Sequence, residues 1–303
     1  PVTLHMCGMP PTRYYISVAP RRQELSYYCN TWYNYGNFSV NAEEMVMGIV
    51  VIGAIFVDIK GYPSEVYIPG GRNAGRVEQV HGGVSRNIAE DIANVELRPT
   101  FISLVDDTGV GADVIKKLNA HKVNTDYIRV TPDGMGTWLA VFGNNGDVVA
   151  AISKRPDLHP IYDILAQHGD EIFEKADSIA IDKDIVKLVF ALAEKHNKPV
   201  YAVVSNMRIA FERRDFLRST QCFVCNQQEA GILFSDDYDD KTPAEMADIL
   251  SRRIKAAQIP RMVVTMGEQG AVYATMEGES GVCPAKHVDV KDTTGAGDAF
   301  FSG

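Results

Sequence analysis

Short apolar runs alternate with amphipathic segments along the chain from Met45 onward. Residues 48–57 (Gly-Ile-Val-Val-Ile-Gly-Ala-Ile-Phe-Val) are apolar and rich in β-branched side chains, as expected for a strand buried on both faces of a parallel sheet. This strand is predicted to deliver Asp58 at its carboxyl end. Similar buried strands are predicted at 101–105, 179–181, 200–204, 222–224 and 262–266. The pattern predicts an α/β fold with a mostly parallel central sheet covered by helices.

Amphipathic segments predict helices after several of these strands. The strand at 101–105 leads through Asp106-Asp107-Thr108-Gly109 into a segment with Val114, Ile115 and Leu118 on one side. Another helix is marked by Thr242-Pro243-Ala244-Glu245, which supplies an N-cap, a proline at the first helical position and a capping-box glutamate. Because Met246, Leu250 and Ile254 then recur at helical spacing, this helix is predicted to pack on the sheet.

Two other segments, about 62–80 and 127–152, show the alternation of short strands instead. Their turn signals are Gly70-Gly71, Pro132-Asp133-Gly134 and Asn144-Asn145-Gly146. They predict a small β-sheet that emerges from the α/β body. Because ligands of doubly wound folds bind at the carboxyl ends of the strands, this sheet is expected to form a lid over that edge.

Residues 1–45 differ from the rest, being rich in Tyr, Pro, Asn and Arg without helical or strand periodicity. We interpret them as an N-terminal extension of unknown role, preceding one domain over 46–303. Interleaved aromatic and arginine residues also suggest a nucleic-acid-binding arm, but the segment has no recognisable nucleic-acid-binding motif, so a packing or disordered extension is favoured.

Composition narrows the functional classes. The 303 residues carry a formal net charge of −9, which argues against a protein that mainly binds nucleic acid or an anionic membrane. The 5 cysteines follow no secreted-scaffold spacing, and no long apolar span interrupts the sequence, so a cytoplasmic protein is expected. Cys222 and Cys225 form a C-x-x-C, but without a second cysteine pair or a histidine pattern, so buried strand cysteines are favoured over a metal site.

Residues 292–300 (Asp-Thr-Thr-Gly-Ala-Gly-Asp-Ala-Phe) predict a glycine turn that opens into a helix. Such a turn presents backbone N–H groups and the positive end of a helix dipole to an anion. A carboxylate just inside that site would repel phosphate unless it accepts a proton from an attacking hydroxyl, which indicates that Asp298 is a general base. The alternative is an ordinary helix start with an acidic first turn.

With this string the chain, over about residues 46–303, resembles the ribokinase (PfkB) carbohydrate kinase family. The resemblance implies a three-layer α/β/α fold with a small β-sheet lid. It also implies that Asp298 is the catalytic base and that the amides of Gly295, Ala296 and Gly297 hold the transferring phosphoryl group.

Three further motifs occur in the order of that family. His81-Gly82-Gly83-Val84-Ser85-Arg86-Asn87 resembles its N-terminal signature, which implies that Gly82, Gly83 and Asn87 bind substrate, with Asp58 accepting hydrogen bonds from hydroxyl groups. Taken alone, paired glycines before a helix are commonly just a turn.

Asn226-Gln227-Gln228-Glu229 resembles the family's Asn-x-x-Glu element, which implies that Asn226 and Glu229 help to organise Mg²⁺ and phosphate, Glu229 through water. Thr265-Met266-Gly267-Glu268-Gln269-Gly270 resembles the nucleotide-side turn, which implies contacts of Thr265, Gly267 and Gly270 with ATP. The alternative is a tight turn between two strands.

The implied reaction is transfer of the ATP γ-phosphoryl group to a hydroxymethyl group. The variant Gly-Gly-Val-x-Arg-Asn-Ile-Ala resembles pseudouridine kinases more than ribokinases, so pseudouridine is the first substrate expected. Kinases for another sugar or nucleoside (ribose, fructose or adenosine) and a catalytically silent ligand-binding module are the alternatives. The resemblance also suggests a homodimer through the lid, a monovalent cation near Asp292 and Thr294, and C-terminal helices beyond Gly303.

Overall fold

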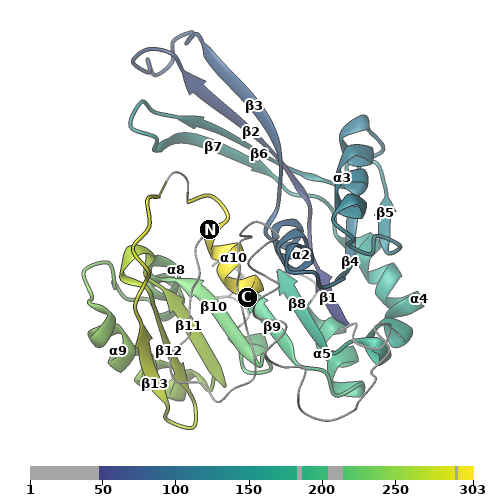
Figure 1. The fold of residues 1–303 in the computed structure, drawn as a ribbon, viewed down its shortest axis with the longest axis vertical. Coiled ribbons are helices and arrows are strands. Elements are labelled where there is room, and N and C mark those ends of the chain that lie inside the picture. Colours follow the sequence, from purple (N-terminus) through teal and green to yellow (C-terminus); the bar gives the residue numbers. More distant parts are fainter. Residues whose placement is uncertain (1–47, 183–185, 204–213, 291–292) are drawn as a thin grey trace, which may run out of the picture. The chain divides into compact units, whose positions relative to one another are not determined.

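The computed structural model describes residues 48–182, 186–203, 214–290 and 293–303 (Figure 1). The chain divides into two compact units. The first contains Ile49–Glu90 and Pro99–Val200, and the second contains Asp91–Arg98 and Tyr201–Gly303. Residues 1–45, interpreted above as an N-terminal extension, lie outside the described residues.

The central sheet contains strands from both units. The first unit supplies β1 (Ile49–Ile52), β4 (Thr100–Val105), β5 (Ile128–Val130) and β8 (Ser178–Asp182). The following strands are β9 (Val200–Val203), β10 (Cys222–Asn226), β11 (Arg261–Thr265), β12 (Ala271–Thr275) and β13 (Ser280–Cys283). The hydrogen-bonded order is β13-β12-β11-β10-β9-β8-β1-β4-β5. The pairs β11-β12 and β12-β13 are antiparallel, and the pairs β9-β10, β10-β11, β1-β8, β1-β4 and β4-β5 are parallel. The predicted mostly parallel α/β sheet is confirmed.

Helices bury the strands of the first unit. These are α3 (Gly109–Ala120), α4 (His159–Lys175) and α5 (Val186–Lys195). Both α3 and α4 contact β4, and α5 packs against α4. Val114 and Leu118 of α3 are buried as predicted, and Ile161 and Phe173 of α4 are buried too. Full burial of each such side chain stabilises the fold by roughly 1.5–3 kcal/mol.

The same unit carries a separate four-stranded sheet, the lid sheet, in the order β3-β2-β6-β7 (Figure 1). Its strands are β2 (Phe56–Pro63), β3 (Gly75–Gly82), β6 (Gly136–Phe142) and β7 (Val148–Lys154). Two antiparallel hairpins, β2-β3 and β6-β7, join through the parallel pair β2-β6. A lid sheet was predicted, but its extent was wrong at both ends, because β2 begins at Phe56 and Ile128–Val130 pairs with β4 in the central sheet.

The predicted strand over residues 48–57 is also wrong as one element. Strand β1 ends at Ile52, and the chain enters the lid sheet at Phe56. Ala54 and Ile55 between them are buried, with exposed fractions of 6% and 0%. Residues 48–57 are therefore apolar because most of them are buried, and not because they form one continuous strand. As a result, Asp58 lies within lid strand β2 and not at the carboxyl end of a central strand.

Helix α2 (Val84–Asn94) follows β3 directly, and its residues Ile88 and Ile92, one helical turn apart, are buried. The second unit adds α7 (Arg214–Leu217), α8 (Gln227–Phe234), α9 (Pro243–Ala257), the 3₁₀ turn η1 (Gly267–Gln269) and α10 (Ala296–Ser302). Helix α9 contacts β11, β12 and β13, and buries Met246, Leu250 and Ile254 as predicted.

Cys222 and Cys225 are buried in β10, which confirms the prediction of strand cysteines. Burial raises the pKa of the Cys222 thiol to about 12 and raises that of Cys225 as well, so both remain protonated and unreactive at neutral pH. Within the described residues, no helix combines the length and the apolar character needed to cross a membrane.

The start of α9 gives a direct test of the sequence-encoded helix signal. The Thr242 hydroxyl oxygen accepts from the Glu245 N–H, and Glu245 Oε2 accepts from the Thr242 N–H at 2.9 Å. We expect Thr242→Ala to lower the free energy of unfolding by about 1 kcal/mol in urea titrations. Because the two hydrogen bonds are reciprocal, Thr242→Ala combined with Glu245→Ala should cost less than the sum of the single changes. Glu277→Ala, in an exposed turn, is the control; strict additivity would contradict the shared cap.

Candidate functional site

In the second unit, several predicted site residues lie where β10 and β11 end. Asn226 is the last residue of β10 and is paired in register with Thr265, the last residue of β11. Asn226 is also the N-cap of α8: its Oδ1 accepts from the Glu229 N–H at 2.8 Å, and Glu229 Oε2 accepts from the Asn226 N–H at 2.8 Å. The Asn-x-x-Glu tetrapeptide is therefore a capping box, a role that its sequence signature could have revealed.

Glu229 lies near Asp298 in a partly buried place. Burial raises the pKa of the Glu229 carboxyl, and the negative charge of Asp298 raises it further, while the hydrogen bond from the Asn226 N–H opposes this. The structure therefore brings together two predicted acidic residues whose like charges repel.

Helix α10 holds Asp298 in its first turn, as predicted. Gly295 is the N-cap in a left-handed conformation (φ 77°), which favours glycine. The Ala296 N–H donates to the Thr293 carbonyl at 3.1 Å, so the turn itself engages one of the three predicted phosphate-binding amides. Asp292 lies outside the described residues.

Two aromatic side chains anchor α10. Phe300 and Phe301 pack against a buried cluster on the sheet that contains Cys222, Val224 and Val263. Because the rings fix the helix on the strands, they also set the place of Asp298 near the end of β10.

The predicted nucleotide-side turn follows β11. The Thr265 hydroxyl donates to the Cys225 carbonyl at 3.5 Å. Gly267 and Gly270 have positive φ angles of 57° and 99°, and the Met266 N–H donates to the Gly270 carbonyl at 2.8 Å. The segment is thus a tight turn into β12.

The first unit holds the second group of predicted residues. Asp58 of β2 packs directly against the end of β3: a Cβ on Gly82 would lie 2.4 Å from Asp58 Oδ1. Gly83 has φ 98°, and a Cβ there would lie 2.8 Å from the Ala54 carbonyl oxygen. The paired glycines therefore leave room for the Asp58 carboxyl and for the crossing between the two sheets. Burial raises the pKa of Asp58, and the charges of Lys60 and Arg86 oppose this.

Sequence reasoning assigned no role to Arg86, which lies beside the predicted residues. The Arg86 guanidinium donates to the side-chain oxygen of Asn87, to the His81 carbonyl at 3.0 Å and to the Glu90 carboxylate. The residue is 9% exposed. All three acceptors lie within five residues of Arg86 in the sequence, but the motif does not show which of them the side chain reaches.

An aromatic group shares the face of the lid sheet that carries Asp58. Trp138 of β6 is the register partner of Asp58, so the two side chains are neighbours on one face. The Trp138 ring meets Phe142 edge-on at 6.3 Å between centroids, and Phe142 stacks on Tyr62 at 4.8 Å.

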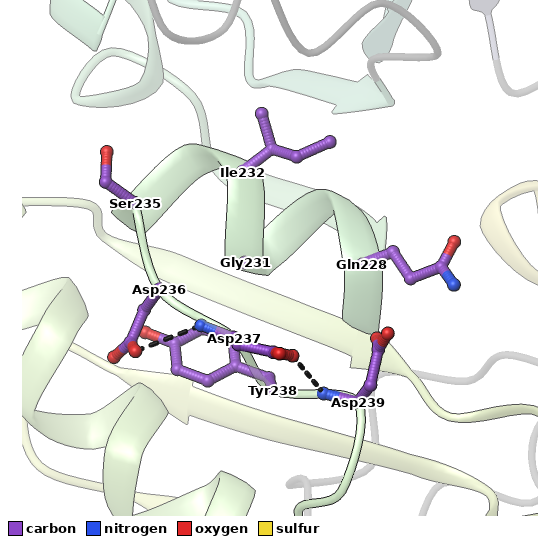
Figure 2. Close-up of a pocket in the computed structure, with 8 residues that line it drawn as sticks. All are labelled: Gln228, Gly231, Ile232, Ser235, Asp236, Asp237, Tyr238 and Asp239. Atoms are coloured by element: carbon purple, nitrogen blue, oxygen red, sulfur yellow. Dashed lines mark hydrogen bonds between the residues drawn. The ribbon is translucent and has the colours of Figure 1, made fainter.

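A shallow pocket at the end of α8 is unrelated to these groups (Figure 2). It is lined by Gln228, Gly231, Ile232, Ser235, Asp236, Asp237, Tyr238 and Asp239. Asp236 pairs with Arg253 at 2.7 Å, and Asp237 accepts from the Asp239 N–H at 3.0 Å. Since none of the predicted site residues lines this pocket, we assign no catalytic role to it.

Comparison with known proteins identifies the family. The sequence model of the pfkB family of carbohydrate kinases matches residues 47–303. The chain belongs to the PfkB family. It is therefore a phosphotransferase that acts on a sugar or nucleoside, and membership of the family implies ATP as the phosphoryl donor.

Individual relatives agree with this assignment. The PfkB chain is 34% identical to the guanosine-inosine kinase of Exiguobacterium acetylicum, over 84% of this chain and 85% of the relative. It is 28% identical to the pseudouridine kinase of Escherichia coli, over 84% of this chain and 82% of the relative. The structure of Arabidopsis thaliana ribokinase matches with a TM-score of 0.70 at 18% identity. The match covers 85% of this chain and 84% of the ribokinase chain, and it confirms the predicted ribokinase-like fold.

The two capping boxes of this PfkB chain give a matched test of the acidic pair. Burial and Asp298 raise the pKa of Glu229, whereas hydrogen bonds from Thr242 lower that of Glu245. A raised pKa means that the folded chain binds the proton more tightly than the unfolded chain, so stability falls as pH rises from the unfolded to the folded pKa. We expect Glu229→Gln to increase the free energy of unfolding at pH 7, and the gain to disappear in acid.

Glu245→Gln is the control and should have the opposite effect. Because the pKa of Glu245 is lowered in the folded chain, its ionised carboxyl stabilises the fold above the unfolded pKa, and this stability is lost as pH falls through the folded pKa. The variant should therefore be less stable than the wild type at pH 7, and the difference should disappear in acid. Urea unfolding between pH 3 and pH 8 measures both differences. A loss of stability at pH 7 for Glu229→Gln would contradict the repulsion between Glu229 and Asp298.

Proposed function

We propose that this PfkB chain is a nucleoside kinase that transfers the γ-phosphoryl group of ATP to the 5′-hydroxyl of a ribonucleoside. The observation that carries the proposal is the Asp298 carboxyl in the first turn of α10, beside Glu229 and next to glycine-rich backbone. A carboxylate in this position repels the phosphate that the glycine turn would bind. We therefore expect the Asp298 carboxylate to have a chemical task, which is to accept a proton.

Asp298 is the proposed general base. As the 5′-oxygen attacks the γ-phosphorus, its proton passes to the Asp298 carboxylate, and the bond from phosphorus to the bridging oxygen of ADP breaks. The amides of Gly295, Ala296 and Gly297 are proposed to hold the transferring group. The Ala296 N–H would leave the Thr293 carbonyl to do so, whereas the following N–H groups already lie in the helical turn that presents its amides outward.

Asn226, Thr265, Gly267 and Gly270 are proposed to contact the nucleotide. The register pairing of Asn226 with Thr265 supports this, since both end adjacent parallel strands. Among the described residues, no group of three or more His, Cys, Asp or Glu side chains could hold a metal directly. We propose that Glu229, acting through water, and Asp298 would help to hold a Mg²⁺ that arrives with the nucleotide phosphates. When bound, the ion would neutralise phosphate charge.

Asp58, Gly82, Gly83 and Asn87 are proposed to bind the sugar. The carboxyl of Asp58, held against Gly82, can accept hydrogen bonds from hydroxyl groups, as its surroundings include Lys60 and Arg86.

Trp138 favours a nucleoside over a free sugar. It is the neighbour of Asp58 on the lid sheet, so an aromatic ring lies beside the proposed sugar site and can stack on a base. The greater identity to guanosine-inosine kinase than to pseudouridine kinase supports a purine nucleoside first. Pseudouridine is the second candidate, because the motif Gly-Gly-Val-x-Arg-Asn-Ile-Ala favours it.

A substrate panel with Mg-ATP tests the function. We expect guanosine, inosine or pseudouridine to have a kcat/KM above that of ribose, fructose and adenosine. Asp298→Asn should lower kcat by about 10²–10⁴-fold with little change in ligand affinity, because it removes the proton acceptor but keeps the shape. Asp248→Asn, exposed on α9, is the control.

Three outcomes would contradict the proposal. Faster turnover of a free sugar would show that Trp138 does not stack on a nucleobase of the substrate. Near-normal turnover by Asp298→Asn would exclude it as the base. Tight binding of ATP and nucleoside by the wild type without any product would identify a catalytically silent module.

We also propose a homodimer through the lid sheet. The face opposite Asp58 carries Val77, Leu139 and Ile152, with exposed fractions of 72%, 41% and 70%. An apolar sheet face of this kind is typical of an interface. We expect light scattering to give twice the 33.4 kDa chain mass for the wild type and one chain mass for Ile152→Lys. Val282→Lys, at an exposed apolar position of β13, is the control; a dimeric Ile152→Lys would contradict this interface.

A further inference from the structure

Arg86 is a buried arginine at the junction of the lid sheet and α2. Its side chain is 10% exposed and reaches back to the His81 carbonyl in β3, at 3.0 Å from Nη2. Nη2 also donates to the Asn87 side-chain oxygen, and Nη1 donates to Glu90. One guanidinium therefore ties the last residues of β3 to the first turns of α2.

The chemistry of the arginine fixes the orientation of the Asn87 amide. A guanidinium has only donors, so the side chain of Asn87 must turn its carbonyl oxygen towards Arg86. The amide N–H₂ group then points to the other side of the Asn87 side chain. This holds regardless of how the oxygen and nitrogen of an amide are distinguished, because the reverse orientation would set two donors against each other.

We propose that Arg86 is a positioning residue that makes Asn87 a hydrogen-bond donor towards the substrate hydroxyl. This inference rests on the proposed function, in which Asn87 and Asp58 contact the sugar. An ionised Asp58 only accepts, and Asn87 held in this way donates on its substrate side. A hydroxyl group both donates and accepts, so it satisfies this pair, whereas a hydrogen or a methoxy group in its place does not.

The Glu90 carboxylate that accepts from Arg86 has further basic neighbours. The Glu90 side chain is 14% exposed, and its Oε1 lies 3.3 Å from Lys117 Nζ and 3.7 Å from His121 Nε2. The charge of Arg86 also opposes the effect of burial on the pKa of Asp58. A lysine at position 86 would keep a positive charge near Asp58, but a single ammonium cannot reproduce the planar fork that reaches three acceptors.

A double-mutant cycle on nucleoside phosphorylation tests the proposal. We expect Arg86→Lys to lower kcat/KM by about 10–100-fold, mainly through KM, because one charge-assisted contact no longer orients Asn87. In the Asn87→Ala background the same change should cost less than about threefold, since the group that Arg86 positions is gone. Lys117→Gln, which also alters the Glu90 network but not Asn87, is the control and should retain wild-type kinetics. Equal losses for Arg86→Lys in both backgrounds would overturn the proposal.

A second measurement does not depend on activity. The side-chain ¹H–¹⁵N resonances of Asn87, assigned by their absence in Asn87→Ala, should shift or broaden in Arg86→Lys and stay unchanged in Lys117→Gln. Unchanged Asn87 resonances in Arg86→Lys would overturn the proposal whatever the enzyme phosphorylates. If the wild type phosphorylates no nucleoside but these resonances respond, the proposed function fails and the positioning by Arg86 stands.

Discussion

The repulsion between Glu229 and Asp298 is the constraint on which the proposed catalytic site in the second unit depends. Folding brings both carboxyl groups to the ends of β10 and α10, where burial and mutual charge raise the pKa of Glu229. Such a pair does not favour the fold. The capping box of α8 on one side and the packing of Phe300 and Phe301 on the other keep the two groups near each other. A phosphoryl transferase can use this arrangement, because one carboxylate accepts a proton and the other favours a cation that arrives with ATP.

The proposed substrate site in the first unit depends on close packing rather than on repulsion. Glycine at position 82 lets the Asp58 carboxyl lie against the end of β3, and glycine at position 83 lets the chain turn beside Ala54. Arg86 then connects β3 to Asn87. In the proposed site, neighbouring residues thus orient Asn87 and Asp58 before any ligand binds, which would lower the cost of ordering them on binding.

Local sequence signals predicted most of the fold. The capping box at Thr242 and the helical spacing of Met246 and Leu250 led to the correct account of α9. The boundary at Ile52 was missed because Ala54 and Ile55 are buried without being part of a strand, and hydrophobicity reports burial only. The sequence Asn226-x-x-Glu229 has the same capping-box pattern as Thr242-x-x-Glu245. The helix start at Asn226 was missed because these four residues were interpreted only as a functional motif.

Long-range contacts were beyond the sequence. The proximity of Asp58 to Gly82 depends on the register of β2 and β3. The acceptors of Arg86 are near in sequence, but the turn from β3 into α2 decides which of them the side chain reaches. By contrast, the glycine turn before Asp298 was predictable because its conformation is local: Gly295 has the positive φ that a glycine permits. A conformation that is set within one turn can be predicted from the sequence, whereas contacts between strands require the structure.

The most direct test of the account is the ³¹P NMR spectrum of the chain with Mg-ATP and guanosine. We predict that ADP appears together with an equal amount of a phosphate monoester whose phosphorus couples to the two 5′-methylene protons. Inorganic phosphate in place of the ester, an ester at another hydroxyl, or unchanged ATP in the presence of each candidate nucleoside would contradict it.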